Sequence, residues 1–254
     1  MKKLKIISLL IILTALGACS QMKQSNGQVS NSAETKKDGV NVPRNLQNSV
    51  PEPNIYKESS AIVTLPNNTD ILYGAAKKPL KLDELGKKFE EYEKSSNDTK
   101  VVYVVADSAN DYASLVKILD IARKQKINTV RLVVSLTDKF EANNILEINL
   151  PYEPKENMQI KPNPLTLLVT MDKDGKFKLN QNDETLGSLT ARLAEVFRNR
   201  AENGVFREGT NEVEQTVFVK APRSAKYGEV AKIIDALKGV YANPIGLQID
   251  DLND

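Results

Sequence analysis

Apolar side chains recur along the chain in two blocks that share one order of predicted elements. In the first block, residues 101–105 form an unbroken apolar run, which is typical of a strand covered on both faces. Apolar positions at helical spacing follow, and a second apolar run at residues 130–134 closes the block. The second block repeats this order, with strands expected at residues 217–219 and 245–249 around an amphipathic helix. The pattern therefore predicts a strand, a helix and a strand in each block.

Two strands and one more helix are expected ahead of this unit in both blocks. The strands are predicted at residues 61–65 and 71–73 in the first block, and at residues 165–171 and 177–179 in the second. The turn between the later two is Asp172-Lys-Asp-Gly175, where glycine tolerates a positive φ. The helical stripes that follow are Leu82, Leu85, Phe89 and Tyr92 in the first block, and Leu186, Leu189, Leu193, Val196 and Phe197 in the second. Each block thus has the order β-β-α-β-α-β, and the fold class is α/β (α+β).

The two blocks align without a gap at a constant offset of 115 residues (227 − 112) from strand through helix to strand. Pairs that share this offset are Val102 and Val217, Tyr112 and Tyr227, Ile118 and Ile233, Asp120 and Asp235, and Leu132 and Leu247. This tandem duplication predicts two related modules. We expect the tyrosines to be packing residues. The aspartates are expected to be solvated or paired on a helix surface, because equivalent positions on separate modules give no reason for two carboxylates to face one substrate.

The composition removes several kinds of chemistry. The chain has no histidine and a single cysteine, Cys19, which excludes Ser-His and Cys-His catalysis, histidine-ligated metals, zinc clusters and disulfides. Asp172 and Asp174 resemble the start of a calcium loop, but the twelfth position is Asp183 instead of a bidentate glutamate. The net charge of +2 becomes −1 without the three lysines of residues 1–18, which does not favour a nucleic-acid partner. The sequence therefore predicts no catalytic residue, no metal site and no cofactor, and the protein is expected not to be an enzyme.

The N-terminal residues 1–18 have the pattern of a secretory signal peptide. Met1-Lys-Lys-Leu-Lys5 is basic, and residues 6–14 are mostly apolar, well short of the roughly 20 residues that a membrane-spanning helix needs. The segment Leu16-Gly-Ala-Cys19 resembles the lipobox of bacterial lipoproteins, which implies cleavage after residue 18 and lipid attachment to Cys19. Ser20 favours the outer membrane over the inner one, by resemblance to lipoprotein sorting in enteric bacteria. The alternative is an uncleaved signal anchor.

The segments outside the two blocks set the predicted domain organisation. Residues 19–58 are rich in Ser, Asn, Gln and Lys and show no apolar period, so they are expected to form a flexible tether. The modules are expected at residues 59–136 and 164–254, with a proline-rich connector at residues 137–163 between them. Within the connector, residues 146–150 favour an additional edge strand.

Turn and packing motifs in both modules point to a known family. In the second module they are Val169-Thr-Met-Asp-Lys-Asp-Gly175, Val219-Lys-Ala-Pro222, Lys226-Tyr-Gly-Glu-Val230, Ile234-Asp-Ala-Leu-Lys238 and Pro244-Ile-Gly-Leu-Gln-Ile-Asp250. In the first they are Val104-Val-Ala-Asp107, Tyr112, Ile118-Leu-Asp120 and Val130-Arg-Leu132. Through these motifs both modules resemble the periplasmic domain of the ExbD/TolR biopolymer-transport proteins. The resemblance supports the fold more strongly than any particular activity.

This resemblance implies a place in the cell envelope. Members of the family usually have a transmembrane helix whose aspartate lies in the proton path of an ion-driven motor formed with ExbB/TolQ-type subunits. Their periplasmic domain couples the motor to TonB- or TolA-type proteins, and in TolR-like members it contacts peptidoglycan. This chain departs from the pattern, because residues 1–18 hold no acidic residue and the domain occurs twice.

The resemblance therefore implies a lipid-anchored periplasmic binding or scaffold protein, accessory to an ion-driven envelope transport system. The alternative is an inner-membrane ExbD/TolR subunit held by an uncleaved N-terminal helix. Because the family's domain is commonly dimeric, the duplication suggests either a homodimer or an intramolecular pseudo-dimer of the two modules.

A small basic group marks the strand-to-helix junction of the second module. It consists of Lys220, Arg223 and Lys226, and the first module has Val105, Ser108 and Asp111 at the equivalent places. Such a group could contact anionic groups of peptidoglycan or an acidic partner. The alternative is an ordinary charged loop.

Overall fold

The computed structural model describes the chain in several stretches. The chain divides into two units, residues 1–31 and residues 32–254, and every described residue belongs to the second unit. The predicted signal peptide and Cys19 lie outside the described residues, so cleavage and lipid attachment stay predictions. The described residues are 34–37, 40–43, 46–50, 61–95, 100–135, 145–152 and 164–250.

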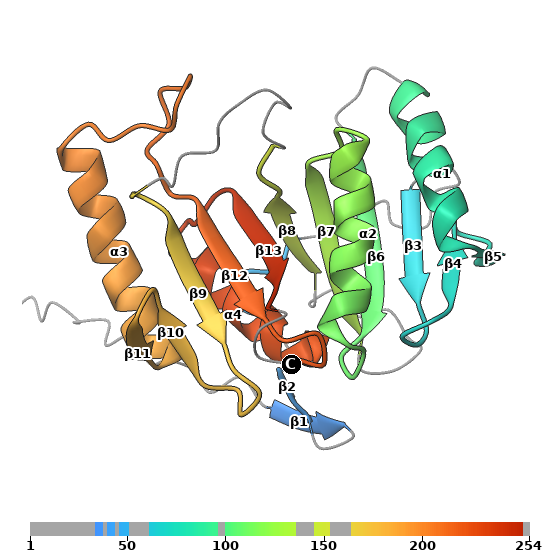
Figure 1. The fold of residues 1–254 in the computed structure, drawn as a ribbon, viewed down its shortest axis with the longest axis horizontal. Coiled ribbons are helices and arrows are strands. Elements are labelled where there is room, and N and C mark those ends of the chain that lie inside the picture. The colour runs from blue at the N-terminus through green and yellow to red at the C-terminus, as the bar shows by residue number, and fades with distance from the viewer. Residues whose placement is uncertain are drawn as a thin grey trace, which may run out of the picture. The chain divides into compact units, whose positions relative to one another are not determined.

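The first module is built on a six-stranded sheet (Figure 1). Its strands are β3 (Ala61–Leu65), β4 (Ile71–Tyr73), β5 (Lys78–Leu80), β6 (Val101–Asp107), β7 (Thr129–Ser135) and β8 (Ile145–Asn149). They lie in the order β5-β4-β3-β6-β7-β8, in which β3, β6 and β7 are parallel and each remaining strand is antiparallel to its neighbour. Helices α1 (Leu82–Lys94) and α2 (Tyr112–Lys124) provide the crossovers between the parallel strands.

The second module repeats this arrangement with five strands. They are β9 (Leu167–Met171), β10 (Phe177–Leu179), β11 (Asn182–Glu184), β12 (Val217–Ala221) and β13 (Ile245–Ile249). Their order, β11-β10-β9-β12-β13, is that of the first five strands of the other sheet. Helices α3 (Leu186–Glu202) and α4 (Tyr227–Gly239) take the places of α1 and α2. The mixed α/β fold with two related modules is therefore confirmed.

The predicted helical stripes are buried at their centres, whereas their first residues are exposed and two later members, Tyr92 and Val196, are half-buried. In α1, Leu85 and Phe89 are fully buried, whereas Leu82 at the helix start is 40% exposed. In α3 the buried apolar residues are Leu189, Leu193 and Phe197, and Leu186 at the start is 38% exposed. A helix start lies at the edge of the packed layer, so its first apolar residue covers less of the core.

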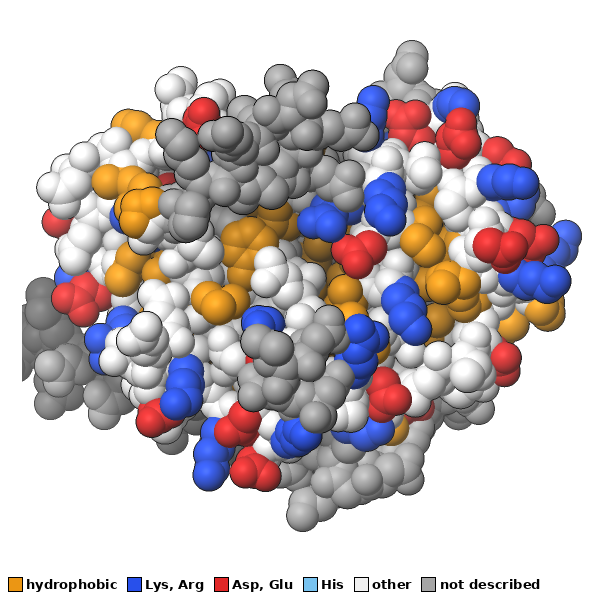
Figure 2. All heavy atoms as spheres, in the orientation of Figure 1, with side chains coloured by type: hydrophobic (Ala, Val, Ile, Leu, Met, Phe, Trp, Pro, Cys, Tyr) orange, Lys and Arg blue, Asp and Glu red, His pale blue; other side chains and the backbone are white. Residues whose placement is uncertain are grey.

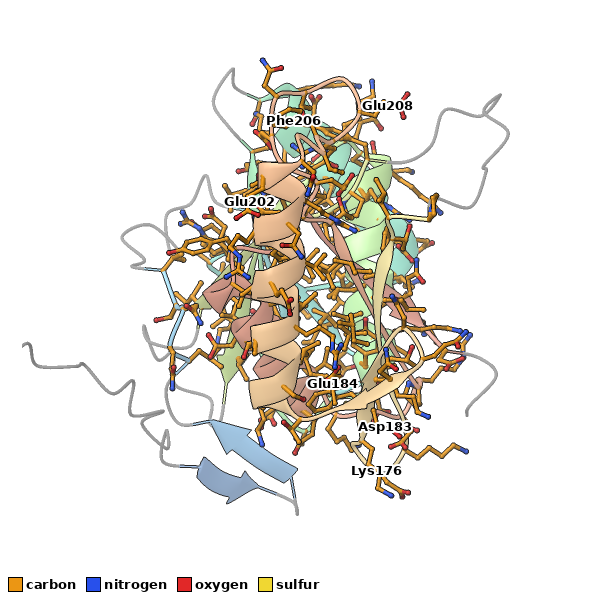
Figure 3. All side chains as sticks on the ribbon, turned by 90° about the vertical axis from the view of Figure 1, so that its left-hand side faces the viewer. Lys176, Asp183, Glu184, Glu202, Phe206 and Glu208 are labelled. Carbon is orange, nitrogen blue, oxygen red and sulfur yellow. The ribbon has the colours of Figure 1, made fainter. Side chains whose placement is uncertain are left out.

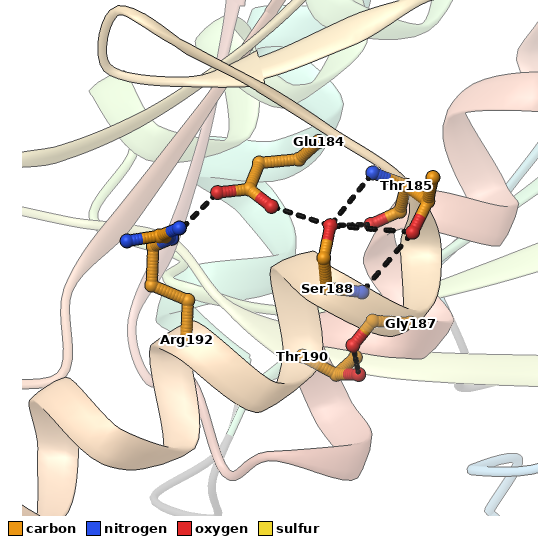
Figure 4. Close-up of polar contacts among 6 residues, drawn as sticks. All are labelled: Glu184, Thr185, Gly187, Ser188, Thr190 and Arg192. Atoms are coloured by element: carbon orange, nitrogen blue, oxygen red, sulfur yellow. Dashed lines mark hydrogen bonds and ion pairs between the residues drawn. The ribbon is translucent and has the colours of Figure 1, made fainter.

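Side chains of the local sequence determine where α3 begins. The Thr185 hydroxyl accepts a hydrogen bond from the Ser188 N–H, and Ser188 Oγ accepts one from the Thr185 N–H at 2.8 Å. This reciprocal arrangement satisfies N–H groups that have no partner within the helix. Ser188 also donates to the Glu184 carboxylate, which accepts a second bond from Arg192 Nε at 2.6 Å (Figure 4). The Ser188 hydrogen bond, followed by that of Arg192, lowers the pKa of Glu184.

Each module contains one short strand that the sequence pattern did not predict. Strands β5 and β11 have three residues each, Lys78-Pro-Leu80 and Asn182-Asp-Glu184, which are too few and too polar to show an alternation. The predicted edge strand at residues 146–150 is confirmed as β8, which pairs with β7. The sheet of the first module therefore extends beyond the boundary expected at residue 136.

The expectation of a flexible tether over residues 19–58 does not hold for its described part. Strands β1 (Glu34–Lys37) and β2 (Val40–Pro43) form an antiparallel pair. Leu46 is 3% exposed and belongs to the core, and the Val50 N–H donates to the Ile145 carbonyl of β8 at 3.0 Å. An apolar anchor and backbone bonds therefore fix residues 46–50, in a segment whose average composition is polar.

A single core of buried side chains runs through both modules. Helix α2 contacts β13 of the other sheet as well as its own β6, and α4 contacts β6 and β7. Helices α2 and α4, the two inner helices, thus bury apolar surface against strands of both modules. A smaller cluster of Ile62, Tyr103, Val133 and Ile145 lies on the other face of the first sheet.

Candidate functional site

The two strand-to-helix loops of the modules meet each other. One loop joins β6 to α2 and the other joins β12 to α4. The Tyr112 N–H donates to the Ala225 carbonyl at 2.7 Å, and the Tyr227 N–H donates to the Asn110 carbonyl at 2.8 Å. Each residue in the first bond stands 115 positions from its equivalent in the second. The contact is therefore reciprocal, like an interface between two copies related by a twofold axis.

Both inner helices are capped by the opposite module. The N-cap residues of α2 and α4 make no side-chain capping hydrogen bond. The first N–H groups of a helix have no acceptor within it. Here the Ala113 N–H donates to the Arg223 carbonyl at 3.2 Å, and the equivalent Gly228 N–H donates to the Ser108 carbonyl at 2.9 Å. The start of each helix therefore depends on carbonyls of the other module.

An ion pair lies at the centre of this loop contact. Asp111 and Lys226 form an isolated antiparallel bridge, and Lys226 Nζ is 2.8 Å from Asp111 Oδ1. Asn68 holds Asp111 from the other side, since Asn68 Nδ2 donates to Asp111 Oδ2 at 2.7 Å and the Asp111 N–H donates to Asn68 Oδ1 at 2.6 Å. Lys226 is the N-cap residue of α4, where a positive charge opposes the helix dipole. The Asp111 carboxylate offsets that unfavourable charge.

The structure places the predicted basic group at this junction and pairs two of its members with carboxylates of the same chain. Lys220 Nζ is 3.0 Å from Asp250 Oδ1, and the Asp250 side chain is buried. Lys226 pairs with Asp111, while Arg223 is an exposed residue. Basic and acidic side chains are interspersed over the face shown in Figure 2. Contact of Lys220, Arg223 and Lys226 with an anionic partner stays a prediction.

The equivalent tyrosines are confirmed as packing residues, with different hydroxyl environments. Tyr112 and Tyr227 are both completely buried, and burial raises the pKa of each hydroxyl. Tyr112 Oη donates to the Val219 carbonyl of β12 at 3.2 Å, again across the module boundary. Within the described part of the chain, the Tyr227 hydroxyl has no hydrogen-bond partner. The pair is therefore equivalent in burial and unequal in polar contacts.

The equivalent aspartates also differ in their partners. Asp120 forms a helix-surface pair with Arg123, at 3.2 Å between Oδ1 and Nη2, as predicted. Asp235 holds the segment ahead of the first module instead. Its carboxylate accepts the Gln47 N–H at 3.1 Å and the Asn48 N–H at 2.8 Å, and Asn48 Nδ2 donates to the Asp235 carbonyl at 2.8 Å. Asp235 therefore acts as a clamp that joins the N-terminal segment to α4 of the second module.

A buried arginine supports the inserted loop of the second module. Arg200 is 7% exposed, its Nη1 donates to the Glu214 carbonyl at 2.7 Å, and its Nη2 donates to the Leu165 carbonyl. Burial lowers the pKa of the guanidinium. Phe206 is 52% exposed on this loop, and Figure 3 shows Phe206 and Glu208 beyond the end of α3. The loop is therefore anchored at its base and carries an exposed aromatic side chain at its bridge between Phe206 and Val213.

An open hollow of about 390 Å³ lies where the end of β8 approaches the start of β13. Two carboxylates that line it already accept hydrogen bonds, since Arg207 donates to Glu212 and the Thr216 N–H donates to Glu214 Oε1 at 2.9 Å. Among the residues that the structure describes, no group of three or more His, Cys, Asp or Glu side chains could hold a metal ion.

Sequence reasoning found Lys226 and missed its partner Asp111, as well as the clamp between Asp235 and Asn48. The signal for the first was present, because Asp111 and Lys226 share the 115-residue offset with opposite charge. No comparable signal connects Asn48 with Asp235, which stands 187 positions away in the chain.

Comparison with known families agrees with the duplicated fold. The family model described as "Biopolymer transport protein ExbD/TolR" matches residues 4–137 and, a second time, residues 132–251. The chain belongs to the ExbD/TolR family. The second match also confirms that this ExbD/TolR chain carries two copies of the family's unit. Membership places it with the accessory proteins of biopolymer transport, a family without catalytic function.

A comparison with curated proteins gives no match. In the part of the chain that the structure describes, none of the helices combines the length and the apolar character needed to cross a membrane.

Proposed function

We propose that this ExbD/TolR chain is a lipid-anchored, non-enzymatic binding or scaffold protein that serves an ion-driven envelope transport system. The observation that carries the proposal is the reciprocal capping of α2 and α4 between two modules of one chain. The family's domain commonly works as a dimer, and here one chain supplies both halves. The modules act together as an intramolecular pseudo-dimer, and this paired unit is the part that binds a partner.

The anchor in this proposal is the lipid on Cys19. It is supported by the Leu16-Gly-Ala-Cys19 segment directly after an apolar stretch. Two or more acyl chains hold a protein firmly at a membrane, since each buried methylene contributes about 0.8 kcal/mol. Ser20 favours the outer membrane. Residues 1–18 contain no acidic residue, which argues against a proton-carrying role for that stretch.

The partner in this proposal is peptidoglycan or a motor protein of the ExbB/TolQ or TonB/TolA type. The basic group of Lys220, Arg223 and Lys226 is the proposed contact. Arg223 is the member with an exposed side chain, and its substitution leaves the ion pairs of Lys220 with Asp250 and of Lys226 with Asp111 in place.

A second candidate function is that of an inner-membrane ExbD/TolR subunit anchored by an uncleaved N-terminal helix. It is favoured by the first family match, which starts at residue 4 and so includes the apolar stretch. The mass of the N-terminal peptide, taken from membranes of the native host, separates the two functions. An acylated peptide that starts at Cys19 is expected. An intact Met1 peptide would exclude the lipoprotein and support the second candidate.

Partner contact is tested by sedimentation of the full chain with purified peptidoglycan in detergent. Retention at low salt is expected, with a weaker yield for Arg223→Ala. Arg198→Ala, an exposed arginine of α3, is the matched control and should sediment like the unchanged chain. Absence of sedimentation at low salt would exclude peptidoglycan and leave the motor proteins as partners.

A further inference from the structure

Asp111 and Lys226 occupy equivalent positions in the two modules and also face each other. In a pairing of two related units about a twofold axis, a residue near the axis meets its own equivalent. Two identical units would therefore place identical side chains there. This chain places a carboxylate opposite an ammonium group, which two copies of either module could not do.

We propose that the contact between the two strand-to-helix loops is a charge-coded pairing surface. Each module accepts the other module of this chain and rejects a second copy of itself. Two first modules would bring Asp111 against Asp111, and two second modules would bring Lys226 against Lys226. Like charges at directly opposite positions of an antiparallel pair are destabilising, and such repulsion is a common source of pairing specificity.

Apart from the bond of the Tyr112 hydroxyl to the Val219 carbonyl, the remaining contacts of the surface do not distinguish the two modules. The four cross-module backbone bonds run from N–H groups to carbonyls, which any residue other than proline provides. Tyr112 and Tyr227 are both buried beside the loops and are the same residue type. Burial of apolar surface is non-directional and favours all pairings alike. Among the described contacts at this boundary, the pair of Asp111 and Lys226 is the one that changes from attraction to repulsion when two copies of the same module meet.

The surroundings of both Asp111 and Lys226 increase the difference in energy between matched and mismatched pairing. Asp111 is held by Asn68 through two hydrogen bonds, and Ser114 Oγ donates to the Asn68 carbonyl at 3.0 Å, which fixes the support. The carboxylate therefore presents a fixed acceptor to Lys226. A second lysine in its place would add its charge to that of Lys226 at the positive end of the α4 dipole.

The expected size of the discrimination is modest. The Asp111 and Lys226 side chains are 32% and 41% exposed, so water and salt screen them. An attraction lost and a repulsion gained together correspond to about a tenfold change in the pairing equilibrium. Because the connector keeps the modules at a high effective concentration, a change of this size should loosen the contact without separating the chain into free modules.

Single charge reversals in the full chain reproduce the rejected contacts. Asp111→Lys places lysine against lysine, as two second modules would, and Lys226→Asp places aspartate against aspartate. Amide hydrogen exchange at Tyr112 and Tyr227, whose N–H groups donate across the boundary, is the readout. Exchange should be about tenfold faster in each single reversal, and the double reversal should return most of the protection. Asp111→Asn, which removes the attraction without adding repulsion, should lie between the unchanged chain and the reversals.

Two controls keep the test specific. The exposed pair Lys178 and Asp183, between β10 and β11, lies at 3.2 Å and away from the boundary, so its reversals should leave exchange at Tyr112 and Tyr227 unchanged. High salt should reduce the difference between the Asp111 and Lys226 reversals and the unchanged chain. Exchange at the unchanged rate in both reversals at low salt would overturn the proposal. So would a double reversal no better protected than either single one.

Discussion

The two modules keep the same buried positions and use different polar contacts at them. Tyr112 and Tyr227 are equally buried, yet one hydroxyl bonds across the module boundary and the other has no partner among the described residues. Asp120 pairs with a neighbour on its own helix, whereas its equivalent Asp235 holds a segment almost 190 positions away. Apolar burial tolerates duplication because it has no direction. Hydrogen bonds and ion pairs need a specific partner, so they are where the copies differ.

The two modules also differ in the segments that each adds to the shared unit of strand, helix and strand. The first module adds β8 to the edge of its sheet beside β7. The second has the longer outer helix and the loop anchored by Arg200, and its sheet ends at β13 within the described residues. Both additions lie outside the shared unit of strand, helix and strand.

The largest expected effect comes from the buried arginine of the inserted loop. Arg200→Ala should lower the free energy of unfolding by about 3 kcal/mol, because two carbonyls lose their donor and the packed guanidinium is removed. Urea denaturation of the full chain measures it. Arg198→Ala, on the exposed side of the same helix, should change stability by no more than about 0.5 kcal/mol. Equal losses in both variants would show that the Arg200 contacts are not needed.

The second largest expected effect is the difference in stability between variants of the equivalent aspartates Asp235 and Asp120. Asp235→Ala should cost about 1.5 kcal/mol, since a charged acceptor of two backbone N–H groups is lost, and Asp120→Ala about 0.5 kcal/mol. Limited proteolysis with N-terminal sequencing of the products should show faster cleavage near Asn48 in the Asp235 variant alone. Protection of that segment in the Asp235 variant would mean that Leu46 and Val50 suffice to hold it.

The equivalent tyrosines should respond to loss of the hydroxyl in opposite directions. Tyr112→Phe should lower the free energy of unfolding by about 1 kcal/mol, because the buried Val219 carbonyl loses the Tyr112 hydroxyl as a donor. Tyr227→Phe should be neutral or stabilising by up to about 1 kcal/mol, since it removes a buried hydroxyl without a described partner. Thermal unfolding of both variants gives the comparison. A loss in Tyr227→Phe as large as that in Tyr112→Phe would contradict it.

The smallest effect is expected at the start of α3 and depends on pH. Hydrogen bonds from Ser188 and Arg192 lower the pKa of Glu184 in the folded chain. A lowered folded pKa contributes stability above the unfolded value, and this contribution is lost as the pH falls through the folded value. The unchanged chain should therefore unfold at a higher temperature than Glu184→Gln at neutral pH, and the two should converge as the pH falls below the folded pKa of Glu184. Glu195→Gln, at an exposed position of α3, serves as the control for removal of a surface carboxylate.

The sequence predicted the elements whose apolar period is long enough to detect. Strands β6 and β12 contain the predicted apolar runs at residues 101–105 and 217–219. The buried face of α1 contains Leu85 and Phe89 of the predicted stripe. Strands β5 and β11 were not predicted, because each has only three residues. So short and polar a segment cannot show an alternation of apolar and polar positions. Composition averaged over the N-terminal segment also concealed Leu46, a single apolar residue that reaches the core.

The site was less predictable than the fold. The offset aligned Asp111 with Lys226, but an alignment shows equivalence and gives no distance. Their contact depends on how the two modules pack, and the capping of Tyr112 and Tyr227 involves carbonyls that every residue possesses. The sequence could therefore identify the basic residues but could not show that Lys226 already has an internal partner.

The clamp at Asp235 has a mechanical consequence. A pull applied to the chain from its N-terminal side passes through β1 and β2 and then reaches residues 46–50, before it reaches β3. Helix α4 carries part of this load through its contact with β2 and its bonds from Gln47 and Asn48, and the Val50 bond to β8 carries another part, so the second module resists the pull although the first is nearer in sequence. Tension would therefore be shared between the two modules at the point of entry. A protein held at a membrane by its N-terminus would transmit force to both halves at once.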